Sequence, residues 1–283
     1  MLDELSAILA ADFGPQSDAA AFAELLYHRC YARALNDPDV PASAANEDLT
    51  PLLIAANCSR EGWDLGWRVE QPLDDGRVLA SKSGAARVFR AGQYLTLRGP
   101  GPRPEAGDPV RVFAPAGSDA IQQDFYYAFG ETVCEFDEFE DLFRYYWNIA
   151  PEGAPRLMAA VTREFNRFQV PFRFKCGRTP AMCRRRDAAV LYIHRRYESI
   201  ASLLLERVHA EIADFLRDSV PLFTQRVARG LGFAEDPGGE SFGQNRCRIL
   251  AEAMLGARTL EEVRRQFTHR GLSLDEPWRN PRP

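Results

Sequence analysis

The chain has 283 residues, of which 46% are hydrophobic, and a formal net charge of −5 at neutral pH. This length and composition fit a globular protein with one large domain or two smaller ones. No stretch approaches the roughly 18 consecutive apolar residues of a membrane span, and the acidic start of the chain differs from a secretory signal. The sequence therefore predicts a cytoplasmic protein that does not span a membrane.

Helical periodicity marks the first 60 residues. Apolar side chains recur at three- and four-residue spacing over 2–13, 19–35 and 48–60, which predicts three helices. Asp18 is placed to cap the second of them.

From residue 66 to 114 the pattern changes to short β-rich runs separated by turn signals. We expect a small antiparallel meander, with an exposed Gly/Pro loop at 99–104. The strands are expected at 67–69, 77–80, 86–89, 94–97 and 110–113.

The second half of the chain alternates strand and helix. The fold class predicted for the whole chain is α+β: a helical and β-meander N-terminal half, and a mixed β-sheet with packed helices in the C-terminal half. We expect an N-terminal region over 1–120 and an α+β domain over 121–283. A single continuous domain is also consistent with the sequence. Strands are predicted at 145–149, 170–176 and 188–193, and helices at 151–168, 198–216, 241–257 and 260–269.

The cysteines and sequence motifs predict no metal and no cofactor. The six cysteines are scattered, without a C-x-x-C pair or a histidine at metal-ligand spacing, so reduced thiols in the core are expected. No phosphate-binding loop, dinucleotide fingerprint or kinase motif is present, which argues against dependence on ATP or NAD.

The charge is distributed unevenly. Residues 144–196 hold 12 basic and three acidic residues, whereas the rest of the chain has a net charge of −14. A basic segment in an acidic protein favours a focused anion site over a nucleic-acid surface, for which a basic domain is typical. The same arginines would also fit solvent-exposed helix faces.

Lysine is scarce, with two residues against 33 arginines. Where only a positive charge is needed this chain uses arginine, so a retained lysine suggests a group that must lose its proton. Lys82 lies in a turn-like polar stretch and reads as a solvated side chain. Lys175 lies in an alternating Phe-Arg-Phe-Lys run that places it beside Arg173 on one strand face. A neighbouring cation would lower its pKa, although an ordinary exposed strand lysine fits the same pattern.

Several blocks of the second half resemble the HopA-type type III effector family, in the family's order and over about residues 124–255. The N-terminal half resembles the family only in general layout. The blocks are 144–149, 151–153, 171–172, 174–175, 187–192, 220–224, 230–232, 234–237, 241–243 and 246–247.

The resemblance implies a function. Many bacterial members belong to biosynthetic clusters for class V lanthipeptides and thioamitides. There a separate phosphotransferase-like kinase phosphorylates Ser or Thr of a precursor peptide. The HopA-type protein then eliminates the phosphate, leaving dehydroalanine or dehydrobutyrine. By this resemblance the partners are a phosphorylated precursor peptide and that kinase, and neither nucleic acid nor membrane is expected. Oligomeric state is left open.

The chemistry of β-elimination assigns roles to particular residues. A neutral Lys175 would take the Cα proton, and arginines would bind the phosphate and stabilise charge on it. Arg173, Arg185 and Arg246 are the expected phosphate ligands, with the N-terminal amides of the 241–257 helix also able to face an anion. A structural ion pair is the alternative for each arginine.

Other predicted site residues have supporting roles. His194, at a strand end in phase with Tyr192, is the candidate general acid, although a lone histidine there is commonly structural. Asn148 and Thr224 are expected to contact substrate. Asp187 and Glu235 are expected to hold the arginines.

The chain departs from the family pattern at two points. Thr224 is followed by Gln225 and Arg226 where the family often has lysine, so no lysine can act there. Cys183 stands where the family usually has an aromatic residue before a loop arginine. Three arginines follow Cys183, and counting back from Asp187 selects Arg185 as the match to the family's loop arginine.

Two other function classes fit the sequence. A non-catalytic scaffold or secreted effector that binds a partner kinase or peptide would tolerate Lys175→Arg, which keeps the charge. A nucleic-acid binder would show affinity that falls steeply with salt.

Overall fold

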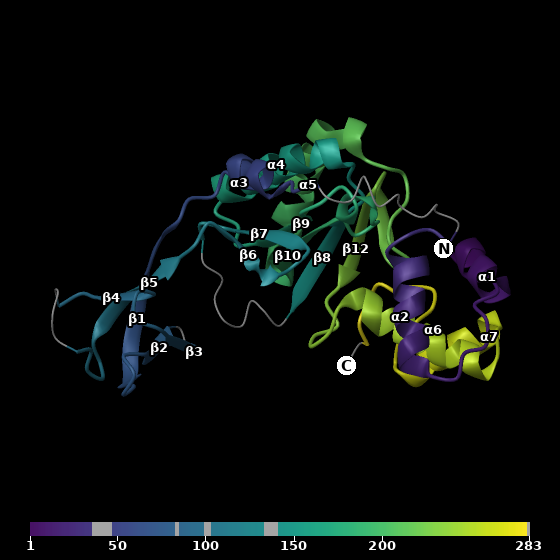
Figure 1. Cartoon of the computed structure of the whole chain (residues 1–283), viewed down its shortest axis with the longest axis horizontal. Coiled ribbons are helices and arrows are strands. Elements are labelled where there is room, and N and C mark those ends of the chain that lie inside the picture. Colours follow the sequence, from purple (N-terminus) through teal and green to yellow (C-terminus); the bar gives the residue numbers. More distant parts are fainter. Residues whose placement is uncertain (36–46, 83–84, 99–102, 133–140, 282–283) are drawn as a thin grey trace.

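The computed structural model describes residues 1–35, 47–82, 85–98, 103–132 and 141–281. It contains two antiparallel sheets, with helices on both faces of the larger one (Figure 1). The predicted α+β class is confirmed. Among the helices of the described residues, none is both long and apolar enough to cross a membrane.

The smaller sheet lies where the meander was predicted, and it extends away from the helices (Figure 1). It is antiparallel as expected but is not a simple meander, because β1 pairs with β5 and the chain crosses from β3 at one edge to β4 at the other. We keep the name meander for this sheet. Its strand order is β3-β2-β1-β5-β4, and the inner faces of β1, β2 and β5 bury a small core of their own. Lys82, expected to be solvated, instead forms an ion pair with Asp64 at 2.7 Å. The strands are β1 (Gly62–Pro72), β2 (Val78–Lys82), β3 (Ala85–Phe89), β4 (Tyr94–Thr96) and β5 (Pro109–Ala114).

The larger sheet has seven strands in the order β11-β12-β8-β10-β9-β7-β6. We expected a mixed sheet, but every described pairing is antiparallel. Four of its strands, β6, β7, β11 and β12, were not predicted. The strands are β6 (Gly117–Gln122), β7 (Phe125–Phe129), β8 (Leu142–Trp147), β9 (Arg173–Gly177), β10 (Ala189–His194), β11 (Gln225–Ala228) and β12 (Leu231–Glu235).

Glycines explain why the β11–β12 hairpin was missed. Gly230 forms its turn at a φ of +63°, which strongly favours glycine. Gly232 lies within β12, where a Cβ atom would come 2.7 Å from Oγ1 of Thr224. Close packing thus requires a residue with low strand propensity.

The helices agree with the predictions except at their ends. Asp18 and Ser241 cap α2 and α6 as expected. The predicted 19–35 helix continues past α2 as a π-helical turn at Tyr27–Tyr31, and the 48–60 helix is shorter. The helices are α1 (Leu2–Ala10), α2 (Ala19–Leu26), α3 (Thr50–Ala56), α4 (Ala154–Arg167), α5 (Glu198–Ile212), α6 (Phe242–Gly256) and α7 (Leu260–His269).

Two cores lie on opposite faces of the larger sheet. Helices α3, α4 and α5 cover one face, and they lie together above the sheet in Figure 1. On the other face, α1, α2, α6 and α7 pack over β8, β10 and β12, so the first and last helices share one core. That core includes no residue of β9 or β7. The charged residues described next lie on this face of the sheet, around β9.

Candidate functional site

Lys175 lies on β9, where the predicted alternation is confirmed. Phe174 and Cys176 are fully buried in the core, whereas Lys175 faces the other way and is half-buried. Its Nζ donates a hydrogen bond to Oε1 of Gln122 at 3.1 Å, and it lies 4.1 Å from the centre of the Phe125 ring. Aromatic and polar neighbours therefore enclose the amine.

This environment makes Lys175 an unusual lysine. Burial lowers its pKa to about 8, and the charges of Arg144, Arg185 and Arg173 act in the same direction. Asp187 opposes them. With a pKa near 8, about a tenth of the amine is neutral at pH 7, against well under one part in a thousand for a free lysine. The amine can therefore serve as a base near neutral pH.

Two arginines share the face of Lys175, one on its own strand and one on β8, two strands away. Arg173 on β9 and Arg144 on β8 both lie opposite Tyr192 of β10, one on each side of it. Each guanidinium carbon lies 5.3 Å from the centre of the Tyr192 ring. Arg144 is also held by Asp236, with Nε 2.8 Å from Oδ2. A positive cluster thus follows the strands across the sheet.

A third arginine reaches the cluster from the loop before β10. Arg185 forms a two-point ion pair with Asp187, with distances of 2.8 and 2.9 Å. Its Nη2 also donates to the hydroxyl of Tyr27 at 2.7 Å. Tyr27 comes from the π-helical turn and stacks on Tyr31, so the N-terminal helices help to position this guanidinium. Burial raises the pKa of Tyr27, which keeps its hydroxyl protonated.

The remaining expected phosphate ligand makes internal hydrogen bonds. Arg246 is buried, and it donates from Nε to the carbonyl of Pro277 and from Nη2 to that of Arg279, each at 2.8 Å. Burial lowers its pKa to about 10. Glu235 accepts from the backbone N–H of Asn280 at 2.7 Å, and it pairs with Arg195 at 3.4 Å and with Arg279 at 3.7 Å. In this structure both side chains anchor the C-terminal segment.

The two predicted substrate contacts also make internal bonds. Asn148 is buried and donates to the carbonyl and the hydroxyl of Ser219, at 2.9 and 3.0 Å. Thr224 is buried and donates to the carbonyl of Pro221 at 2.6 Å. Both hold the loop that leads into β11.

His194 lies at the end of β10, where its Nδ1 accepts from the backbone N–H of Arg196 at 3.1 Å. Val190, four residues earlier, is the partner of Lys175 across the sheet. This spacing separates His194 from the Lys175 position by about 13 Å along the strand. The two predicted catalytic residues share a face but are not adjacent.

The sequence interpretation missed four residues of this site: Arg144, Tyr27, Tyr127 and Gln122. Arg144 alternates in phase with Tyr146 within β8, and this local signal could have identified it. Tyr127 donates to the same Gln122 oxygen as Lys175, at 3.0 Å. Neither Tyr27 nor Gln122 carries a local signal of its role here, because Arg185 and Lys175 lie 158 and 53 residues away from them.

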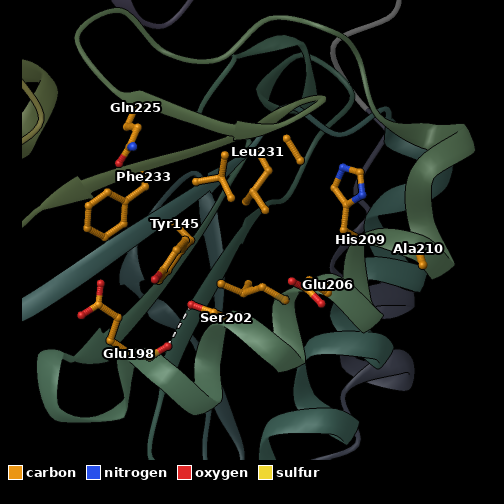
Figure 2. A pocket seen from close by; sticks show the side chains of 12 residues that line it. Tyr145, Glu198, Ser202, Glu206, His209, Ala210, Gln225, Leu231 and Phe233 are labelled. Atoms are coloured by element: carbon orange, nitrogen blue, oxygen red, sulfur yellow. Dashed lines mark hydrogen bonds between the residues drawn. The ribbon is translucent and has the colours of Figure 1, made fainter.

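The sheet also has a cavity on its opposite face (Figure 2). It encloses about 400 Å³ between α5 and strands β8, β11 and β12. Tyr145, Glu198, Glu206 and His209 line it, and His209 contacts the carbonyl of Arg229 at 2.9 Å. We call the surface around Lys175 the cationic face; its charged residues are Arg144, Arg173, Lys175 and Arg185. None of these residues lines the cavity, so we place the candidate site on the cationic face.

Within the described residues, no group of three or more His, Cys, Asp or Glu side chains is arranged to hold a metal ion. Of the cysteines, Cys30, Cys176, Cys183 and Cys247 are buried thiols, as expected, and Cys58 is exposed. Cys134 lies outside the described residues.

The fold is a helix–sheet–helix α+β domain with a meander beside it, and one strand face carries a lysine among arginines. A profile of the HopA1 effector protein family matches residues 116–279. The chain belongs to this family. The match begins before and ends after the blocks noted in the sequence.

Solved structures of two effector proteins share the fold. The effector from Pseudomonas syringae pv. tomato strain DC3000 has 17% identity and a TM-score of 0.56, over 98% of this chain and 95% of its own. The effector from Pseudomonas syringae pv. syringae strain 61 has 16% identity and a TM-score of 0.53, over 93% and 96%. No curated protein sequence matches the chain.

Proposed function

We propose that the protein is a phosphoserine/phosphothreonine lyase. It would remove phosphate by β-elimination from a kinase-phosphorylated precursor peptide during biosynthesis of a ribosomally made peptide natural product. The observation that carries the proposal is the position of Lys175: an amine with a pKa lowered to about 8, on a face shared with Arg144 and Arg173 and close to Arg185.

The reaction needs a base and no cofactor. Neutral Lys175 takes the Cα proton of the phosphorylated residue, and the electron pair left behind forms the Cα–Cβ double bond. The Cβ–O bond breaks, and its electrons leave with the phosphate. The products are dehydroalanine or dehydrobutyrine in the peptide, and inorganic phosphate.

The arginines suit the leaving group. A guanidinium binds phosphate through two parallel N–H donors and stabilises the charge that develops as the C–O bond breaks. Asp187 and Asp236 hold two of these arginines with charge-assisted hydrogen bonds. Because these bonds use only part of the five N–H donors of each guanidinium, they can orient the arginines for a phosphate. The same positive charges help to keep Lys175 neutral.

The leaving oxygen needs a proton or strong charge neutralisation. His194 remains the sequence-based candidate, but its place along β10 is distant from Lys175. The hydroxyl of Tyr127 is closer, because it shares the Gln122 oxygen with Lys175. Burial raises the pKa of Tyr127, which keeps a proton available for donation.

The proposal includes two cytoplasmic partners, a precursor peptide and a kinase. Since the sequence contains no kinase motif, a separate phosphotransferase-like kinase is needed to phosphorylate the precursor.

The alternative function is that of a non-catalytic scaffold or an effector that binds a kinase or peptide. The name "effector" of both structural relatives and the ion pairs that already engage Arg144 and Arg185 favour that alternative.

A substitution that keeps the positive charge at residue 175 distinguishes the lyase from the scaffold. Wild-type protein, Lys175→Arg and the control Lys82→Arg would each be incubated with a phosphothreonine peptide, with mass spectrometry to detect loss of phosphoric acid. The lyase proposal expects elimination by wild type and Lys82→Arg only, with phosphopeptide binding retained by all three. Binding by all three without any elimination would favour the scaffold.

A further inference from the structure

A groove lies between the two sheets, beside the cationic face. It encloses about 660 Å³ and is lined by β1, β3 and β5 of the meander and by the ends of β7 and β9 of the larger sheet. Its walls are mainly apolar, with five aromatic side chains: Trp67, Phe89, Phe113, Phe129 and Phe172.

Hydrogen bonds and ring contacts fix the meander wall of the groove. The indole N–H of Trp67 donates to Asp64 at 2.6 Å, and the Trp67 ring meets Phe89 edge-on at 4.9 Å. The other carboxylate oxygen of Asp64 pairs with Lys82. The remaining charged side chains of the lining are Arg87 and Arg173. Asp64 is thus paired, and the groove is an apolar surface with two guanidinium groups in its lining.

Arg173 connects this groove to the candidate catalytic site. It lines the groove and precedes Lys175 by two residues on the same face of β9. Two residues of a strand span about 7 Å, which is also the reach of two residues of an extended peptide. A peptide with its phosphate between the arginines thus has a side chain two or three residues away at the groove.

We propose that this groove binds an apolar side chain of the phosphorylated peptide, two or three residues from the phosphorylated Ser or Thr. The inference rests on the proposed function and adds a sequence preference to it. Burying a Phe or Leu side chain among these rings removes apolar surface from water. Arg173 belongs both to the groove and to the cationic face, so a peptide that carries a phosphate meets a cation of complementary charge at this end of the groove.

The direct test moves one phenylalanine along a phosphopeptide. Each peptide has a central phosphothreonine in an Ala/Gly background, with Phe at one position from four residues before to four residues after it. We expect Phe at two or three residues from the phosphothreonine, on one side, to raise kcat/KM by about tenfold over the peptide without Phe. A flat profile would overturn the groove inference and leave the lyase proposal standing.

Groove variants assign the preference to this surface. Phe89→Ala removes part of a wall, and Ala114→Trp fills the groove from the end of β5. Both are expected to abolish the preference for Phe while elimination from the peptide without Phe changes less than threefold. Val88→Ala is the matched control, because Val88 precedes Phe89 on β3, is 48% exposed and does not line the groove. A preference that survives both groove variants would contradict the inference.

Binding distinguishes failure of the inference from failure of the proposed function. Fluorescence anisotropy with Lys175→Arg measures the affinity of the same peptides without turnover. If no peptide is eliminated but the Phe-containing peptides bind more tightly in a groove-dependent way, the lyase proposal fails and the groove inference stands. If no peptide is eliminated or bound, both are overturned.

Discussion

The Nζ atom of Lys175 donates a hydrogen bond to the side-chain oxygen of Gln122 at 3.1 Å. This contact predicts the effect of a nearly isosteric change. Gln122→Glu would place a carboxylate beside the amine and raise the pKa of Lys175, because an opposite charge favours the protonated form. We expect elimination at pH 7 to fall about tenfold and to recover at higher pH. Gln123→Glu, which adds the same charge at the next residue, is the control for a general charge effect.

The pKa of Lys175 predicts the pH dependence of the wild type. With a pKa of about 8, kcat/KM should rise with pH by about tenfold per unit below pH 7 and level off above about pH 9. A rate profile between pH 6 and 10 measures this. A profile that is flat across this range would show that no group with this pKa acts as the base.

The same pKa predicts a change in stability. Folding lowers the pKa of Lys175 to about 8, from about 10.4 in an unfolded chain. Between these values the unfolded chain binds more protons, so this lysine makes wild-type stability rise with pH. Below about pH 8 the destabilising contribution of this charged lysine reaches its full size. Lys175→Met should therefore raise Tm at pH 7, by about 3 °C, with less gain at pH 10.

The second lysine is a matched control for that measurement. Lys82 forms an ion pair with Asp64, whose other oxygen accepts from Trp67. Lys82→Met is expected to lower Tm at pH 7, because it leaves the carboxylate without its cation. If Lys175→Met destabilised the protein as Lys82→Met does, the amine would not be in an environment that disfavours its charge.

Asp187 and Tyr27 hold Arg185, and this arrangement predicts unequal effects. Asp187→Asn would leave a buried guanidinium without its carboxylate and cost about 3 kcal/mol of stability. Tyr27→Phe would remove one hydrogen bond and cost about 1 kcal/mol. Urea unfolding measures both.

Asp187→Asn should also move the pH profile of the elimination rate to lower pH, since Asp187 raises the pKa of Lys175. An unmoved profile would argue against this coupling.

Arg173 and Arg246 are expected to differ in kind. Arg173→Met should weaken phosphopeptide binding by about tenfold to a hundredfold. Arg246→Met should release the C-terminal segment and lower stability, because it removes the donors to Pro277 and Arg279. Its affinity for phosphopeptide at a temperature where it is folded should stay within about threefold of wild type. A loss as large as that of Arg173→Met would restore Arg246 as a phosphate ligand.

Local patterns in the sequence identified what depends on neighbouring residues. The alternation in β9 placed Arg173 and Lys175 on one face. Asp187, which was expected to hold an arginine, pairs with Arg185, the arginine that the family resemblance selected. Polar–apolar alternation failed for β7, because its residues Phe125–Phe129 form a continuous aromatic and apolar run. It failed for β6 because that edge strand is mostly exposed and polar.

The rest of the site depends on contacts between distant segments. Arg144 meets Arg173 across Tyr192 only because β10 lies between β8 and β9, and strand order is not encoded in any one strand. The sequence put Arg246 near a helix start but did not show that residues 277–279 would cover it. Burial decided the environment of that arginine, as it did the pKa of Lys175.

The central claim is that the amine of Lys175 is the base for β-elimination. The most direct measurement follows a phosphothreonine peptide by mass spectrometry in a single turnover, with wild type and Lys175→Arg at equal bound fractions. The account predicts dehydrobutyrine and free phosphate with wild type and neither with Lys175→Arg. Equal elimination by both proteins, or none by folded wild type that binds the peptide, would contradict it.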